Sequence, residues 1–191
     1  MKGRDSGMPE EAYWATFFDP ETALDRLIPS DARGGHAVEF GCGYGTFTLA
    51  AARSITGRVT ALNIEPEMVA TVRQKAQAEQ LKNIDAVIRD FVSDGTGLPD
   101  ASQQHAMIFN PLHLEDPVGL LREAWRVLEE NGRLSVIHWR SDIPTPRGPS
   151  LDIRPSPNQC RSWMEQAGFR LVKPVALDAC CPYHFGLVAQ R

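Results

Sequence analysis

Short apolar runs alternate along the chain with longer segments in which apolar residues recur at every third or fourth position. The short runs predict buried strands, and the longer segments predict amphipathic helices. Strands are expected at residues 36–40, 59–64, 85–89, 105–110, 133–139, 169–177 and 184–189. Helices are expected at residues 19–28, 44–54, 65–80, 116–132 and 156–168, with a short helix that begins at 9–11.

Several helix boundaries are marked by residues that favour helix ends. Asp116 and Pro117 predict the start of one helix and Gly132 its end, while Ser156 and Gln159 form a capping-box pattern at the start of the next. Strands that alternate with helices are typical of a doubly wound, mostly parallel sheet. The last two strands have only a short connection, which cannot form a parallel crossover, so the last strand should be antiparallel. We therefore expect an α/β fold with a seven-stranded sheet.

Length and composition suit one globular domain. The chain has 191 residues, of which 42% are hydrophobic and 23% charged, and its formal net charge is −4. A basic face for nucleic acid is not expected, and the apolar runs are too short and interrupted to span a bilayer. Residues 1–7 have no apolar stretch behind them, so we do not expect a signal peptide.

The cysteines Cys42, Cys160, Cys180 and Cys181 are expected to be free thiols of a cytoplasmic protein. Their spacing matches no zinc pattern, so no metal site is expected. The adjacent pair at 180–181 has two interpretations: a thiol site for a metal or an arsenical, or two small residues at a turn. Neither the role of this pair nor the oligomeric state follows from the sequence.

The most informative stretch is residues 38–45, where an apolar run leads into three glycines at alternate positions. It predicts a strand, a sharp turn and a helix, and glycine lets a ligand approach the backbone closely. Amides at the start of the helix can hold a negatively charged group. Glu39, at the end of the strand, would face a positively charged group. An ordinary strand-to-helix turn with a capping glutamate is the alternative.

This pattern of an acidic residue followed by Gly-x-Gly-x-Gly resembles motif I of class I S-adenosylmethionine (SAM)-dependent methyltransferases. The order of strands and helices resembles the same family over residues 19–191. The resemblance implies that Glu39 binds the ammonium of SAM and that the glycine turn binds its carboxylate. The implied turn residues are Gly41, Cys42, Gly43, Tyr44 and Gly45.

Two other functions stay open beside the methyltransferase. The dinucleotide fingerprint needs glycine or alanine where this chain has Thr46, so an NAD-binding oxidoreductase is the weaker alternative. A SAM-binding module without catalysis is the other, because the chain departs from the family at Asn63 and has no clear base.

Other strand ends match further motifs of the family. Asn63 stands where the family has an acidic residue for the ribose hydroxyls, so Glu65 is a candidate to supply the missing charge. Ile64 would offer an apolar face to the adenine. Asp90 resembles the family's acceptor for the adenine amino group, with Phe91 at the ring edge; turn capping is the other interpretation of Asp90.

Residues 109–117 resemble the stretch after the fourth strand in small-molecule methyltransferases of the quinone-biosynthesis type. Asn110 is assigned to the cofactor site, and the Asn-Pro pair also resembles the amine-binding motif of amino-group methyltransferases, which ranks second. The resemblance implies SAM as cofactor and a small-molecule methyl acceptor as partner. His113 and His138 are candidate bases for a hydroxyl or ammonium nucleophile. Each could instead order its loop or pack in the interior.

An appended domain that would form an acceptor pocket is not expected from the sequence. We expect this pocket to come from aromatic residues within 1–18, from the proline-rich residues 140–157 and from the final hairpin. Residues 1–18 are interpreted as an aromatic lid, with packing against the outer helices as the alternative, and residues 19–191 as a single methyltransferase domain. The arginines of 140–157 could meet a carboxylate or phosphate of the acceptor, or could simply be solvated.

Overall fold

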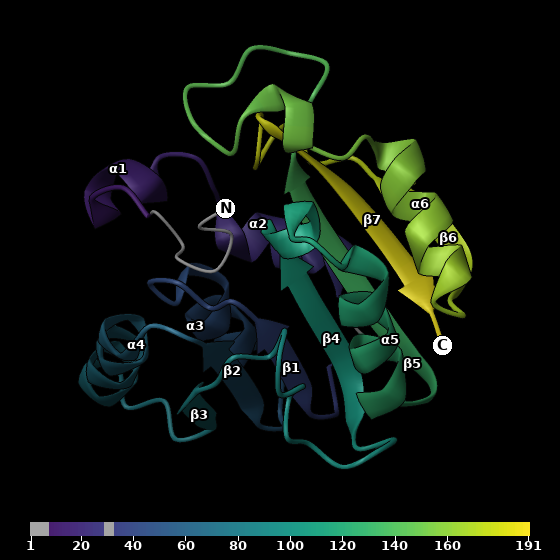
Figure 1. The fold of residues 1–191 in the computed structure, drawn as a ribbon. Coiled ribbons are helices and arrows are strands. Elements are labelled where there is room, and N and C mark those ends of the chain that lie inside the picture. The colour runs from purple at the N-terminus through teal and green to yellow at the C-terminus, as the bar shows by residue number, and fades with distance from the viewer. Residues whose placement is uncertain (1–7, 29–32) are drawn as a thin grey trace.

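The computed structural model describes residues 8–28 and 33–191, so the expectation for residues 1–7 lies outside the described residues. Helices pack on both faces of a seven-stranded sheet (Figure 1). The strands are β1 (Ala37–Phe40), β2 (Val59–Asn63), β3 (Ile84–Ile88), β4 (Gln103–Phe109), β5 (Leu128–Trp139), β6 (Arg170–Val175) and β7 (His184–Gln190). The helices are α1 (Glu11–Ala15), α2 (Pro20–Leu27), α3 (Thr46–Ser54), α4 (Pro66–Ala78), α5 (Pro117–Val127) and α6 (Pro157–Gln166), with the 3₁₀ turns η2 (Pro111–His113) and η3 (Leu151–Ile153).

The strand order is β3-β2-β1-β4-β5-β7-β6. Strands β1 to β5 are parallel to one another, whereas β7 lies between β5 and β6 and is antiparallel to both. The expected mostly parallel sheet with an antiparallel last strand is therefore confirmed. Trp139 pairs with His184, so the start of β7 lies beside the carboxyl end of β5.

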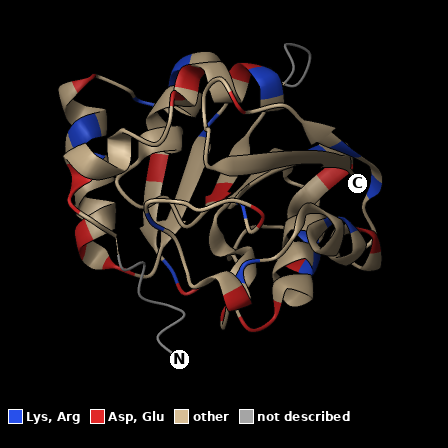
Figure 2. Cartoon of the chain, turned by 90° about the horizontal axis from the view of Figure 1, so that it is seen from above, with Lys and Arg blue, Asp and Glu red and all other residues tan. Residues whose placement is uncertain are grey.

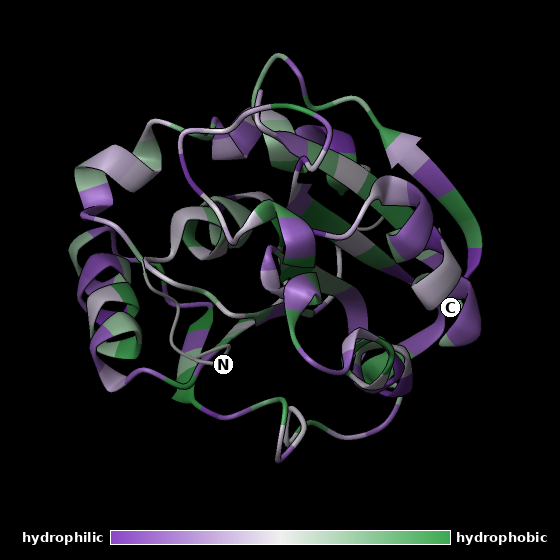
Figure 3. Ribbon diagram, turned by 45° about the horizontal axis from the view of Figure 1, so that its top comes forward, coloured by the Kyte–Doolittle hydropathy of each residue, from purple (hydrophilic) through white to green (hydrophobic). Residues whose placement is uncertain are grey.

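Side chains of the central strands point alternately to the two faces of the sheet, and each face packs into its own hydrophobic core. Val38 and Phe40 of β1 pack with α5 and α6, whereas Ala37 packs with α2 and α3 on the opposite face. Helix α4 covers β2 and β3 beside α3. The ribbons of the central strands are largely hydrophobic, while the outer turns of the helices are hydrophilic (Figure 3). Because Glu39 alternates with Val38 and Phe40, its side chain points towards the α3 face.

Helix α5 ends earlier than the sequence predicts. Gly132 was expected at its C-terminus, but the helix ends at Val127, and Leu128 already pairs with Gln103 as the first residue of β5. Leu128 is therefore buried as a strand residue, packed in the core with residues of α5 and α6. The register then shifts, and Asn131 adopts a φ of 66° where the strand is irregular. The expectation for Gly132 is therefore wrong, whereas the capping box at the start of α6 is confirmed.

Candidate active site

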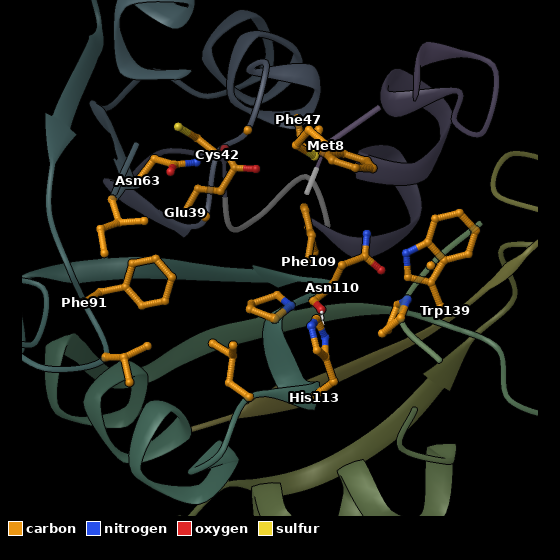
Figure 4. A pocket seen from close by; sticks show the side chains of 18 of the residues that line it. Met8, Glu39, Cys42, Phe47, Asn63, Phe91, Phe109, Asn110, His113 and Trp139 are labelled. Carbon is orange, nitrogen blue, oxygen red and sulfur yellow. Dashed lines mark hydrogen bonds between the residues drawn. The ribbon is translucent and has the colours of Figure 1, made fainter. Parts of the chain in front are cut away.

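A cavity of about 460 Å³ opens at the carboxyl ends of the parallel strands (Figure 4). Its walls come from the ends of β1, β2, β4 and β5, from the loops after β3 and β5, and from α1. This volume lies in the usual range for small-molecule sites, roughly 300–1,000 Å³. The position is also the one at which open α/β sheets bind their ligands.

The glycine turn forms one side of this cavity. Gly41, Gly43 and Gly45 have φ values of 85°, 50° and 82°, which glycine adopts without the steric cost that other residues meet. A Cβ on Gly41 would meet only Phe91, at 3.8 Å, so the backbone there is open to a ligand. A Cβ on Gly45 would lie 3.0 Å from Val72, so this third glycine permits the close packing of α4.

The structure separates the five predicted turn residues into two groups. Gly41, Cys42 and Gly43 line the cavity, whereas Tyr44 and Gly45 do not. The Tyr44 hydroxyl donates a hydrogen bond to the carbonyl of Pro9 at 2.9 Å, and Tyr44 therefore ties the N-terminal segment to the turn.

Glu39 lies at the floor of the cavity with 2% of its surface exposed. The hydroxyl of Thr48, on α3, donates a hydrogen bond to its carboxylate. Burial raises the pKa of Glu39 to about 8, although the hydrogen bond from Thr48 acts in the opposite direction. A ligand cation beside Glu39 would reverse this shift, because an opposite charge favours the ionised carboxylate.

Asn63 and Cys42 form the part of the floor beside Glu39 (Figure 4). The Asn63 Oδ1 atom accepts a hydrogen bond from the backbone N–H of Glu65 at 2.9 Å, which fixes the start of α4. Burial, followed by the charge of Glu39, raises the pKa of the Cys42 thiol, so it stays protonated. Ile64 also lines the cavity, as expected, whereas Glu65 is not among its lining residues.

Asp90 and Phe91 line the opposite wall at the end of β3. The Asp90 Oδ1 atom accepts hydrogen bonds from the backbone N–H groups of Val92 at 3.1 Å and Ser93 at 3.2 Å. Asp90 therefore caps this turn and faces the cavity, so the two interpretations of its role are compatible. Phe91 packs edge-on against Phe40, with ring centroids 5.6 Å apart.

Asn110 and His113 line the cavity at the end of β4. Asn110 adopts a φ of 75°, and its buried Oδ1 atom has no hydrogen-bond partner. The Nδ1 atom of His113 lies 2.8 Å from the Asn110 carbonyl oxygen (Figure 4). A carbonyl can only accept, so Nδ1 carries the proton in neutral His113 and Nε2 keeps its lone pair. Burial lowers the pKa of His113, although the bond to Asn110 opposes this effect.

His138 occupies a different environment from His113. Its side chain is buried, it does not line the cavity, and its ring centroid lies 5.6 Å from that of His113. Burial lowers the pKa of His138 to about 3, although the Nδ1 atom donates to the carbonyl of Trp139 at 3.2 Å. The two predicted bases are therefore neighbours, but His113 is the one that faces the cavity.

Aromatic residues that the sequence did not single out complete the cavity. Phe47, Phe109 and Trp139 line it, together with Trp14 from the predicted aromatic segment. Phe47 and Phe109 pack with ring centroids 4.6 Å apart. Trp139 is the last residue of a strand whose sequence predicts a buried element. Only its position at the carboxyl end of that strand could have indicated that it lines the cavity.

Residues 140–157 and the N-terminal segment contribute to the cavity as expected, whereas the final hairpin does not. The lining residues of the first two segments are Met8, Pro9, Trp14, Arg147, Gly148, Pro149 and Ile153. Cys180 and Cys181 are buried elsewhere, free of disulfides. Among the residues that the structure describes, no group of three His, Cys, Asp or Glu side chains could hold a metal ion. No helix in the same part of the chain is long and apolar enough to cross a membrane.

Comparisons with known proteins agree with this arrangement. Residues 37–132 match the family model described as a methyltransferase domain. The chain is 27% identical over 172 residues to aklanonic acid methyltransferase DauC of Streptomyces sp. (strain C5), covering 79% of this chain and 77% of that protein. It is 39% identical over 134 residues to an uncharacterized 37.1 kDa protein in transposon Tn4556 of Streptomyces fradiae. That match covers 68% of this chain but only 37% of the transposon protein's length.

The fold is also that of a known structure. A SAM-dependent methyltransferase from Aquifex aeolicus superposes with a TM-score of 0.78 at 24% identity, covering 91% of this chain and 90% of that one. The fold and the family match over residues 37–132 together define the class of protein to which the chain belongs. The chain belongs to the methyltransferase domain family, within the class I methyltransferases that use SAM.

Proposed function

We propose that this protein transfers the methyl group of SAM to a small organic acceptor. The observation that carries the proposal is a single cavity with two chemically different ends. One end has the glycine turn, Glu39 and Asp90, and the other has His113 among aromatic side chains. A methyltransferase needs both ends, because the cofactor and the acceptor must meet in line with water excluded.

The residues at the first end fit SAM. Glu39 would hold the ammonium, the amides of Gly41 to Gly43 the carboxylate, Asn63 the ribose, and Asp90 the adenine amino group. Ile64 and Phe91 would pack against the adenine, and Asn110, with its unpartnered Oδ1, would complete the site. When bound, SAM supplies an electrophilic methyl group on a sulfonium. Tyr44, Gly45 and Glu65 support the turn and the start of α4 from outside the cavity.

His113 is the proposed general base for an acceptor with a hydroxyl or ammonium group. Its burial-lowered pKa keeps it neutral at pH 7, and its Nε2 atom can accept a proton. His138 would then pack behind His113 and take no proton. The quinone-biosynthesis-like subgroup is favoured over the amino-group subgroup, because Leu112 and His113 replace the last two positions of the amine-binding motif.

Residues 8–18 are proposed to act as a lid over the cavity. Trp14 lines the cavity, and α1 is tied to α4 by the ion pair of Glu11 with Lys75. Lys75 also donates to the Tyr44 carbonyl at 2.8 Å, so the lid is joined to the glycine turn. A proposed cytoplasmic location is supported by four buried free thiols, which stay reduced there.

A small organic acceptor is supported by the named relative, which is a methyltransferase for aklanonic acid. Acidic and basic residues are interspersed along the ribbon, without a long basic segment, in the view of Figure 2, which supports an acceptor other than nucleic acid.

The first test is calorimetric titration with SAM, S-adenosylhomocysteine (SAH) and NAD. Micromolar binding of both adenosyl ligands, weakened roughly tenfold or more by Asp90→Ala, is the expected result. Binding of NAD but of neither adenosyl ligand would contradict the proposal. SAM affinity without SAH production from any acceptor in a panel of phenols, hydroxyquinones, acids and amines would favour a non-catalytic module.

A further inference from the structure

We propose that Met8 covers the bound cofactor at the glycine turn and that the ion pair of Glu11 with Lys75 holds it there, so that SAH leaves only when this contact opens. This inference rests on the proposed function. It adds one cofactor-binding residue, Met8, and two positioning residues that act through it. We call residues 8–11 the strap.

The strap lies against the glycine turn. Met8 and Pro9 line the cavity, and a Cβ on Gly43 would lie 3.1 Å from the Cε atom of Met8 and 3.7 Å from its sulfur. Met8 lies on the same side of the cavity as Cys42 (Figure 4). The amides of this turn are the proposed partners of the cofactor carboxylate. A ligand bound there would therefore lie against the Met8 thioether, which adapts to irregular apolar surfaces.

Three polar contacts hold the strap in this position. The Tyr44 hydroxyl donates a hydrogen bond to the Pro9 carbonyl at 2.9 Å. Lys75, on α4, forms an ion pair with Glu11 and donates to the Tyr44 carbonyl at 2.8 Å. The strap, the glycine turn and α4 therefore meet at one ammonium group, which connects the strap to the cofactor end of the cavity.

These contacts are weak enough to open. Helix α1, which begins at the last residue of the strap, has five residues, none of them buried, and no side-chain hydrogen bond at its N-cap. A helix this short is not stable by itself, so its position depends on tertiary contacts. The side chains of Lys75 and Glu11 are 29% and 46% exposed, and ion pairs with this exposure contribute little.

The other end of the N-terminal segment is anchored more firmly. Phe17 is 3% exposed, and its ring centroid lies 5.4 Å from that of Trp139. Trp14 packs on the same indole with centroids 6.2 Å apart. Because the aromatic end is buried and the polar end is not, opening should begin at the strap and leave Phe17 in the core. The strap can then release the cofactor end while the aromatic wall stays in place.

The kinetics of SAH binding separate this role from general support of the turn. Stopped-flow tryptophan fluorescence over a series of SAH concentrations measures both rate constants, because Trp14 and Trp139 line the cavity. Glu11→Gln removes the charge of the strap and leaves the bond from Lys75 to Tyr44 in place. It should raise the SAH dissociation rate constant roughly two- to fivefold. The association rate constant should stay the same or rise, because an open strap also eases entry.

Further variants test the same contact. Met8→Ala removes the covering side chain and should speed SAH dissociation roughly three- to tenfold. Lys75→Arg keeps a cation beside Glu11 and should lie nearer to wild type than Lys75→Ala does. Lys82→Ala, at an exposed position after α4 and outside the cavity lining, removes the same charge as Lys75→Ala and serves as control, with unchanged SAH kinetics.

Salt gives a second readout of the ion pair. Added NaCl should speed SAH release from the wild-type protein more than from Glu11→Gln, because salt screens a partly exposed pair of charges and the variant no longer has that pair. The difference between the two proteins removes any effect of salt on the ligand's own charges.

Two results would overturn the proposal while the wild-type protein binds SAH. One is an unchanged SAH dissociation rate constant in both Glu11→Gln and Met8→Ala. The other is a fall of the association rate constant in these variants, which would mean that the glycine turn itself is damaged. Absence of SAH binding by the wild-type protein would instead contradict the proposed function.

Discussion

The Nδ1 atom of His113 donates a hydrogen bond to the carbonyl oxygen of Asn110, three residues earlier, at 2.8 Å. Both residues belong to the short segment that follows β4, and Asn110 reaches this arrangement through a φ of 75°. A backbone acceptor therefore selects the tautomer of the histidine that faces the cavity. Non-glycine residues in this backbone region carry strain of roughly 1–3 kcal/mol, and such strain clusters at functional sites.

Replacing His113 by alanine should lower kcat for a hydroxyl acceptor by roughly 100- to 10,000-fold, the usual contribution of a general base. SAH affinity should change little, because His113 contacts the backbone carbonyl of Asn110 and not its side chain, and the other proposed cofactor residues come from other strand ends. Initial-rate kinetics and calorimetry measure the two effects separately. His36→Ala, at an exposed site on the opposite end of the sheet, is the matched control.

The pH dependence gives an independent check on His113. Because burial lowers its pKa, the acid limb of the kcat profile should lie below the ordinary value near 6.5. The rate should rise as pH increases through that limb, since only neutral His113 can accept the proton. A wild-type profile without this limb, or one that persists in His113→Ala, would assign the proton transfer to another group.

Glu39→Gln should weaken SAM binding roughly 10- to 100-fold, because it removes the charged partner of the ligand ammonium. In the wild-type protein, binding below pH 8 should release a proton, because the cation draws Glu39 from its protonated to its ionised form. Calorimetry in buffers of different ionisation enthalpy measures that proton. Proton release by the glutamine variant equal to that of wild type would exclude Glu39 as its source.

The same carboxyl should make the unliganded protein less stable as pH rises. The folded pKa of Glu39, about 8, lies above the ordinary value of 4.5, so the folded state keeps a proton that the unfolded chain has released. Its contribution to the free energy of unfolding is full below pH 4.5 and is lost as pH rises to about 8. Glu39→Gln should therefore melt at a higher temperature than wild type at pH 8, and this gain should shrink at pH 5.

Asn63→Asp should strengthen SAH binding by roughly three- to tenfold, because a carboxylate accepts hydrogen bonds from both ribose hydroxyls. The aspartate would still accept from the Glu65 N–H, so the start of α4 should be kept. Asn63→Ala is the paired variant and should weaken binding. Calorimetry that finds no gain in Asn63→Asp would mean that Asn63 does not face the ribose, or that Glu39 opposes the new charge.

Gly148→Ala should raise the acceptor KM and leave SAH affinity unchanged. The new Cβ would lie 2.9 Å from the Trp139 ring at a φ of 113°, so the loop must shift away from the indole. The free energy of unfolding should fall by about 1–3 kcal/mol, the usual cost of a side chain in such a conformation. Gly34→Ala, where a Cβ would meet nothing within 4 Å, is the matched control in thermal unfolding.

The sequence predicted the mostly parallel sheet with its antiparallel last strand, and most of the residues that line the cofactor end, for local physical reasons. Three alternate glycines after a strand end specify one kind of turn, and Asp90 follows another strand directly. Parallel strands bring these ends to one edge of the sheet without any further information. The roles of these residues toward SAM remain predictions until they are tested.

What the sequence could not predict depends on contacts between distant residues. The end of α5 was misplaced because Leu128, which continues the apolar spacing of the helix, belongs to β5 and pairs with the distant Gln103. His113 and His138 both follow apolar runs in the sequence, and only the structure shows that His138 is buried within β5 whereas His113 lines the cavity. The role of Arg154, which donates to the carbonyls of Arg147 and Pro149, depends on hydrogen bonds across the loop, and a charge pattern alone cannot show it.

The seating of the 140–157 loop on Trp139 has an evolutionary consequence. The strand ends and the glycine turn are built into the sheet, whereas the loop joins two finished elements, β5 and α6, and touches the cavity through a few residues. Substitutions in that loop would change which molecules are methylated, while the residues proposed to bind the cofactor would stay the same. Proteins with this fold could therefore acquire new acceptors through changes in the single loop between β5 and α6. Grafting this loop from one relative onto another should likewise transfer acceptor preference.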